Sequence, residues 1–206
     1  MTAAQDERAA LVATLREIGP DAPTLCGDWT TRDLVAHLIL REGRPDAAGG
    51  ILIKALSGYH DKVFAKIAAG DWDEMLYKLA GGPPVYSPFK LVDSFANLSE
   101  MFVHHEDVRR TGSDWAPREL GADVQRELRR PAATIGKQTL RRSPATTVLK
   151  TPDGKELARG GSGPVVEVTG EPGELLLFAF GREPARVEFV GDADAVAAVK
   201  SAKRGF

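Results

Sequence analysis

The fold of this chain is decided by residues 98–107, which read Leu98-Ser99-Glu100-Met101-Phe102-Val103-His104-His105-Glu106-Asp107. A helix over this stretch places Glu100 and His104 on one face, one turn apart. Three of the four histidines, His37, His104 and His105, lie in helix-like and otherwise apolar segments, and His37 is available as a third ligand. The sequence therefore predicts a metal site formed by His37, Glu100 and His104.

The surrounding helix, expected over residues 90–110, offers few positions to water. One face carries an apolar stripe, which consists of Leu91, Phe95, Leu98 and Phe102. A separate polar stripe consists of Asn97, Glu100, His104 and Asp107. Polar groups on a mostly buried helix need partners, and either a divalent cation or a hydrogen-bond network would satisfy a Glu and two His. Both interpretations stay open. Asp107, one turn from His104, is the natural group to orient its ring, whereas His105 is expected to be a hydrogen-bonded core residue.

Composition favours an ordinary soluble, cytoplasmic protein. The chain has 206 residues, of which 43% are hydrophobic and 27% charged, with a formal net charge of -2. This balance gives no reason to expect nucleic acid or an anionic membrane as a partner, and no apolar run approaches the roughly 20 residues that span a bilayer. The single cysteine, Cys26, excludes an intramolecular disulfide, and it is interpreted as a partly buried small residue rather than a reactive thiol.

The first two thirds of the chain are expected to be helical. Thr30 and Asp33 form a variant capping box, in which Asp replaces the usual Glu or Gln, at the start of the helix that carries His37. Apolar residues recur at helical spacing, with Gly and Pro breakers between the segments. They predict a first helix that ends near residue 18 and further helices over 30–43, 51–69, 72–79 and 90–110.

After about residue 143 the pattern changes to short alternating or Val-rich runs separated by Gly and Pro turns. Strands are predicted at 146–150, 155–159, 165–169 and 186–190. A buried helix is expected over 174–180, and Asp192 is expected to cap a final helix. The predicted class is α+β, with a helical domain over 1–143 and a small α+β domain over 144–206.

Two basic features have competing interpretations. Between residues 126 and 142 there are six basic residues and one acidic residue, but no aromatic residue to stack on a base, so a solvated helix face is favoured over nucleic-acid binding. Arg182 follows the predicted buried helix. It is interpreted either as a bidentate partner for a ligand carboxylate or as a charge that complements the helix dipole.

Three motifs together resemble the DinB-like, mycothiol-dependent maleylpyruvate isomerase family. Residues 26–38 are similar to its Gly-Trp-Thr…Asp-Leu…His-Leu signature, and Glu100 to His104 followed by Asp107 is similar to its second metal motif. The run from Val168 to Arg182 resembles the small C-terminal domain of many members. The resemblance covers nearly the whole chain, in the right order.

This resemblance implies a DinB-like four-helix bundle whose open end binds a divalent metal, usually zinc, through His37, Glu100 and His104. It also implies a sterol-carrier-like C-terminal domain, an actinobacterial cytoplasmic setting and mycothiol as thiol cosubstrate. Arg182 matches the position of the arginine that closes the family's site from the second domain. The resemblance implies that it is catalytic, that it contacts the bound cosubstrate and that it holds a substrate carboxylate. Residues 81–88 and His105 depart from the isomerase pattern, which favours a separate metal-binding branch.

The expected function is therefore a thiol-dependent S-transferase or isomerase that acts on a small electrophile. Its metal is zinc first, with nickel or iron also suited to a two-His, one-carboxylate set. The alternatives are a metal-binding or small-ligand carrier without turnover, and a purely structural helical module with a hydrogen-bonded His/Glu cluster.

Overall fold

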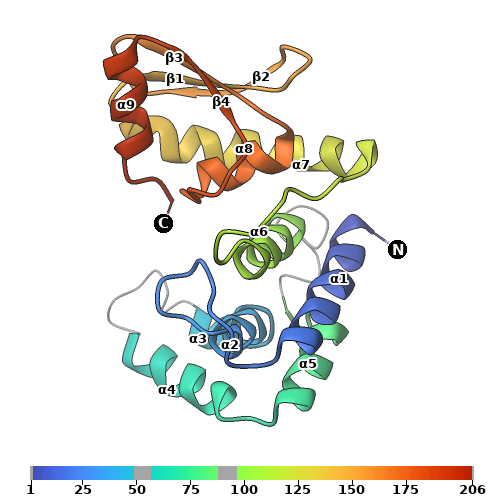
Figure 1. The fold of residues 1–206 in the computed structure, drawn as a ribbon. Helices are drawn as coiled ribbons and strands as arrows, with labels where there is room; N and C mark the ends of the chain where they lie inside the picture. Colours follow the sequence, from blue (N-terminus) through green and yellow to red (C-terminus); the bar gives the residue numbers. More distant parts are fainter. Residues whose placement is uncertain (1, 49–56, 88–96, 206) are drawn as a thin grey trace. The chain divides into compact units, whose positions relative to one another are not determined.

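The computed structural model describes residues 2–48, 57–87 and 97–205, and they form two compact units, Met1–Trp115 and Ala116–Phe206 (Figure 1). The first unit is helical and the second contains a sheet. Along the part of the chain that the structure describes, no helix combines the length and apolar character needed to cross a membrane.

The first unit is a bundle of helices around one apolar core (Figure 1). The helix α1 packs against α5 and α6, and α2 packs against α4 and α5. Fully buried leucines and methionines from four of these helices fill the interior: Leu11, Leu15, Leu34, Leu38, Leu76, Leu79 and Met101. The elements are α1 (Ala3–Ile18), α2 (Thr31–Gly43), α3 (Pro45–Ala48), α4 (Ser57–Ala68), α5 (Trp72–Gly81) and α6 (Leu98–Arg109).

The helix α2 begins at the predicted capping box. The hydroxyl of Thr30 accepts a hydrogen bond from the backbone N–H of Asp33, and the carboxylate of Asp33 accepts one from the N–H of Thr30 at 3.0 Å. Asp can replace Glu here because its shorter side chain still reaches the N–H at the helix start. The box fixes where α2 begins and hence where His37 lies.

Almost the whole circumference of α6 is buried. From Leu98 to Val108 the buried positions include every residue except Glu100, whose side chain is 20% exposed. The predicted helix starts eight residues earlier, but residues 90–96, which include Leu91 and Phe95, lie outside the described residues, as do 51–56 of the predicted third helix. The bundle therefore leaves one side of α6 open at Glu100.

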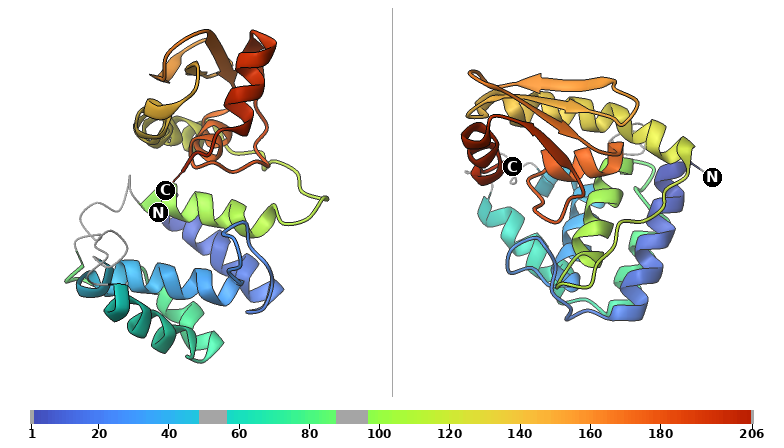
Figure 2. Two further views of the ribbon diagram at one scale, coloured as in Figure 1. Left: turned by 90° about the vertical axis from the view of Figure 1, so that its left-hand side faces the viewer. Right: turned by 45° about the horizontal axis from the view of Figure 1, so that its top comes forward.

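The second unit is a four-stranded sheet, ordered β2-β1-β3-β4, packed on helices (Figure 2). Strand β1 pairs antiparallel with β2 and parallel with β3, and β3 pairs antiparallel with β4. All four predicted strands are present to within two residues. The elements are α7 (Ala122–Thr139), a 3-10 turn (Leu140–Arg142), β1 (Thr146–Lys150), β2 (Glu156–Gly160), β3 (Val165–Thr169), α8 (Pro172–Ala179), β4 (Glu188–Gly191) and α9 (Ala193–Ser201).

The two units divide earlier than the sequence suggests, at Trp115 rather than near residue 143. The reason is α7, whose buried positions Leu128, Ala132 and Gly136 recur every four residues and contact α8 and β2. A Cβ atom at Gly136 would lie 2.8 Å from Leu149, so the glycine permits this close packing on the sheet. The basic residues of α7 occupy its other face. The predicted α+β class, with a DinB-like helical part, is confirmed.

Candidate metal centre

The structure brings His37, Glu100 and His104 together. His37 comes from α2, and α6 supplies Glu100 and His104 one turn apart. Oε1 of Glu100 lies 3.3 Å from Nε2 of His37 and 3.3 Å from Nε2 of His104. The three ligand atoms all lie within 4.8 Å of one another. The carboxylate thus stands between two imidazole nitrogens.

These spacings fit a divalent metal. Ligands about 2.0–2.1 Å from a tetrahedral metal stand about 3.3–3.4 Å apart, whereas an ordinary N–H···O bond measures about 2.9–3.0 Å. The contacts of Glu100, at 3.3 Å, match the first value, and without metal they are long hydrogen bonds. The side chains are 15%, 20% and 11% exposed for His37, Glu100 and His104, so the cluster is reachable from one side. Three protein ligands with one accessible side are typical of a metal site that receives a further ligand.

Electrostatics set the charge of the cluster when it holds no metal. Burial lowers the pKa of His37, and the hydrogen bond to Glu100 only partly opposes this. Burial also disfavours charge on the other two residues, but it is outweighed. Hydrogen bonds from both histidines hold the pKa of Glu100 well below its usual range, and bonds to Asp107, Cys26 and Glu100 hold the pKa of His104 well above. The metal-free cluster therefore contains a carboxylate and one imidazolium.

Asp107 lies where the sequence predicts a group that orients His104. Its Oδ2 is 2.9 Å from Nδ1 of His104, and its side chain has no exposed surface. With Nδ1–H donated to a carboxylate, Nε2 is the ring nitrogen left to face Glu100 and a metal.

Sequence reasoning missed Cys26. Its Sγ lies 3.0 Å from Oδ2 of Asp107 and 3.7 Å from Nδ1 of His104. No His lies beside Cys26 in sequence, so the sequence predicts only a partly buried small residue, whereas the histidine that its thiol contacts is 78 residues away. No local pattern carries that signal.

Arg41 is a second residue that the sequence analysis did not assign to the site. Its Nε lies 3.5 Å from Oε1 of Glu100, and its Nη1 donates to Oδ1 of Asn97 at 3.0 Å. Arg41 follows His37 by one helical turn on the same face of α2, so a signal was available. It gives the site a cation next to the proposed carboxylate ligand.

The indole ring of Trp29 packs against His37 and against Phe64. The ring of Trp29 lies 5.2 Å from the imidazole of His37 and 5.8 Å from the ring of Phe64, centroid to centroid. Trp29 belongs to the loop that precedes the capping box. It limits the rotation of His37 and places a fluorescent side chain beside the cluster.

Two further residues of the sequence analysis are His105 and Arg182. His105 donates or accepts through both ring nitrogens, to Glu7 at 2.7 Å and Thr14 at 2.9 Å, which confirms a hydrogen-bonded core histidine. Arg182, at the end of α8, donates to the carbonyl of Phe180 at 3.1 Å. Its role as an anion clamp stays a prediction.

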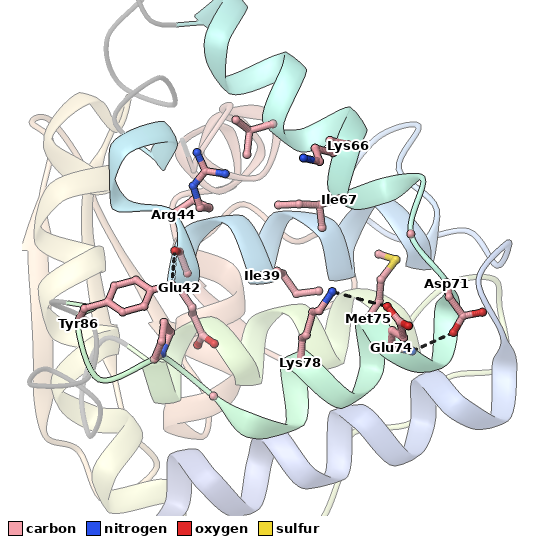
Figure 3. A pocket seen from close by; sticks show the side chains of 15 residues that line it. Ile39, Glu42, Arg44, Lys66, Ile67, Asp71, Glu74, Met75, Lys78 and Tyr86 are labelled. Carbon is pink, nitrogen blue, oxygen red and sulfur yellow. Dashed lines mark hydrogen bonds and ion pairs between the residues drawn. The ribbon is translucent and has the colours of Figure 1, made fainter.

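A cavity of about 450 Å³ lies elsewhere in the first unit, between α2, α4 and α5 (Figure 3). Its apolar residues include Ile39, Ile67 and Met75, and Lys66 and Lys78 stand around them. None of its lining residues belongs to the His/Glu cluster. The His37/Glu100/His104 cluster is therefore separate from this cavity.

Comparison with known proteins supports the sequence resemblance. A family model described as the mycothiol maleylpyruvate isomerase N-terminal domain matches residues 1–51, a span that includes His37 and ends before α6. No curated protein matches the chain. A crystal structure of the mycothiol-dependent maleylpyruvate isomerase is similar over 90% of this chain and 88% of that chain, with 15% identity and a TM-score of 0.60.

A crystal structure of a mutant of that isomerase also matches, over 87% of this chain and 85% of that one, with 18% identity and a TM-score of 0.46. At 15% identity, the first structure establishes a shared fold. The resemblance to the mycothiol-dependent maleylpyruvate isomerase family that the sequence predicts is confirmed.

Proposed function

We propose that this protein is a metal- and thiol-dependent S-transferase or isomerase that acts on a small electrophile. The single observation that carries the proposal is the His37/Glu100/His104 cluster, in which the carboxylate oxygen stands 3.3 Å from both imidazole nitrogens. Two imidazoles and a carboxylate suit zinc, nickel or iron, and zinc is our first choice. The family match to the N-terminal residues supports mycothiol as the thiol.

When bound, a divalent metal would lower the pKa of a coordinating thiol and so supply a thiolate at neutral pH. The chain's own residues hold the ligands in place: Asp107 fixes the ring of His104, and Trp29 packs on His37. Arg41, next to Glu100, keeps positive charge at the site and favours a substrate with a negative group. Arg182 is proposed, from the family resemblance, to bind a substrate carboxylate.

The reaction class follows from what a thiolate does to an electrophilic carbon. The sulfur forms a bond to that carbon with its own lone pair. In an addition the carbon's π bond breaks and its electron pair moves onto the conjugated acceptor group, and in a substitution the σ bond to the leaving group breaks and its pair departs with that group. In a transferase the C–S bond is kept. In an isomerase the bond breaks again after rotation about the substrate's former double bond, and the thiol is regenerated. Both outcomes use the same site.

Metal content by mass spectrometry on untagged protein tests the proposal. We expect close to one equivalent of a transition metal in the wild type and its loss in Glu100→Ala. Glu74→Ala is the matched control, because Glu74 is an exposed glutamate of α5 outside the cluster. A wild type that holds no metal and takes up neither zinc nor nickel would reduce the cluster to a hydrogen-bonded network.

Thiol consumption separates the enzyme from a carrier. Metal-loaded protein is mixed with mycothiol, or with another low-molecular-weight thiol, and a panel of small electrophiles including cis-configured unsaturated acids. Loss of thiol indicates transfer, and cis–trans conversion without loss of thiol indicates isomerisation. Neither change with any pair, in protein that carries one metal, would favour a non-catalytic metal-binding or small-ligand carrier.

A further inference from the structure

We propose that Cys26 is a positioning residue for the metal centre: its thiol holds the carboxylate of Asp107, which in turn holds the ring of His104. The inference deepens the proposed function, since the ring it positions is one of the proposed ligands. It assigns a role to the chain's only cysteine, which neither the sequence pattern nor the family match supplies.

One carboxylate oxygen connects the two side chains. Sγ of Cys26 donates to Oδ2 of Asp107 at 3.0 Å, and the same oxygen lies 2.9 Å from Nδ1 of His104. Asp107 has no exposed surface, so water does not compete for this oxygen. The thiol and the imidazole therefore bind Asp107 together from two sides.

The backbone around Cys26 holds the thiol in this place. The N–H of Leu25 donates to the carbonyl of Asp107 at 2.9 Å, and the N–H of Cys26 donates to the hydroxyl of Thr24 at 3.1 Å. That hydroxyl donates in turn to the carbonyl of Trp29 at 2.8 Å. The loop is thus tied both to α6 and to its own far end, which keeps the backbone of Cys26 beside Asp107.

The spacing distinguishes a positioning thiol from a metal ligand. A sulfur and an oxygen bound to one tetrahedral metal at about 2.3 and 2.0 Å stand about 3.5 Å apart. The distance from Sγ to Oδ2 is 3.0 Å, and that from Nδ1 to Oδ2 is 2.9 Å. Both are hydrogen-bond lengths. The ring of His104 therefore has a metal-spaced partner, Glu100 at 3.3 Å, on Nε2 and hydrogen-bonded partners on Nδ1.

This arrangement predicts how the site changes when the thiol is removed. Without the thiol donor, Oδ2 of Asp107 loses one of its hydrogen bonds, and the carboxylate holds the ring of His104 less firmly. Partners that orient a metal-binding histidine contribute about 10- to 100-fold to metal affinity. Cys26 acts through one such partner, so its contribution is expected near the lower end.

The test is a cobalt titration of wild type, Cys26→Ala, Cys26→Ser and Thr14→Ala, followed by the cobalt absorption spectrum and the fluorescence of Trp29. We expect Cys26→Ala to weaken cobalt binding about tenfold and to change the ligand-field bands. Cys26→Ser keeps a donor and should restore most of the affinity. Thr14→Ala removes the bond to the neighbouring His105, whose side chain contacts none of the three proposed ligands, and should leave cobalt binding unchanged.

Two results would overturn the inference. Equal cobalt affinity in Cys26→Ala and wild type would show that the thiol positions nothing. A thiolate-to-cobalt charge-transfer band in the wild type that disappears in Cys26→Ser would make Cys26 a direct ligand instead.

A second measurement keeps the inference separate from the proposed function. Imidazole nitrogen NMR on metal-free protein should show a change at His104, and none at His105, when Cys26 is replaced by Ala. If no variant binds metal but this change is seen, the metal function fails and the positioning role stands. If metal binds and the resonances of His104 do not change, the positioning role fails alone.

Discussion

Two adjacent histidines of α6 stand in opposite environments. His105 is enclosed between α1 and α6, with Glu7 on one ring nitrogen and Thr14 on the other, at 2.7 and 2.9 Å. His104 faces the open side of the helix, where His37 and Glu100 converge at the longer spacing of 3.3 Å. Residue type and burial are similar in both. The number of converging ligand atoms and their spacing distinguish a candidate metal ligand from a core residue.

The largest expected effect is a difference in metal content between variants of the two histidines. His104→Ala should lose the bound metal, because it removes one of the three proposed ligands. His105→Ala should keep close to one equivalent, since neither of its partners belongs to the cluster. Metal analysis of both purified variants checks this. Equal metal loss in the two variants would mean that the two environments are not separate.

For the free energy of unfolding, we expect the opposite order: His105→Ala should lose more stability than His104→Ala. His105→Ala leaves the buried carboxylate of Glu7 without this partner, which we expect to cost about 2–4 kcal/mol of unfolding free energy. Urea denaturation of metal-free protein measures it, with the double variant Glu7→Ala/His105→Ala as control. That double variant should recover part of the loss, because it removes the buried charge as well. A loss in His104→Ala larger than that in His105→Ala would contradict the comparison.

The helices of the first unit and the four strands follow from local signals, because helical spacing, capping residues and Gly or Pro turns act over a few residues. The capping box at Thr30 is an example. The His37/Glu100/His104 set could also be proposed, since two of its members share one helix turn. By contrast, the contact between Cys26 and Asp107 joins residues 81 positions apart in sequence, so no local spacing predicts it. Likewise, α7 belongs to the second unit because it packs on β2, and this packing cannot be predicted from the spacing of its own residues.

Metal affinity should depend steeply on pH through His104. Its hydrogen bonds to Asp107, Cys26 and Glu100 overcome burial and raise the pKa, so the metal-free ring is protonated over a range that extends above pH 6.5. A metal must displace the proton on Nε2. Affinity should therefore rise with pH through this range, with about one proton released per metal bound, as calorimetry in buffers of different ionisation enthalpy would show. A pH-independent affinity would contradict a protonated His104.

The raised pKa of His104 also determines whether the metal-free protein gains or loses stability as the pH rises. Because the folded pKa of His104 is raised, its stabilising contribution is complete below pH 6.5 and is lost as the pH rises through the folded value. Metal-free wild type should therefore lose stability with rising pH, and His104→Gln should show a weaker loss. The metal-loaded protein is expected to show the reverse trend, since binding strengthens as the pH rises.

The smallest effect belongs to an exposed ion pair of the second unit, which provides a contrast to the buried cluster. Asp153 accepts hydrogen bonds from Thr151 and Arg129, and these hold its pKa at about 2. A lowered carboxyl pKa stabilises the fold above the ordinary value of 3.8, and the contribution is lost as the pH falls through about 2. Asp153→Asn should therefore change stability slightly at pH 7 and by much less at pH 2, and added salt should reduce the difference because the pair is open to solvent. A difference as large at pH 2 as at pH 7 would show that Asp153 acts through packing rather than through its charge.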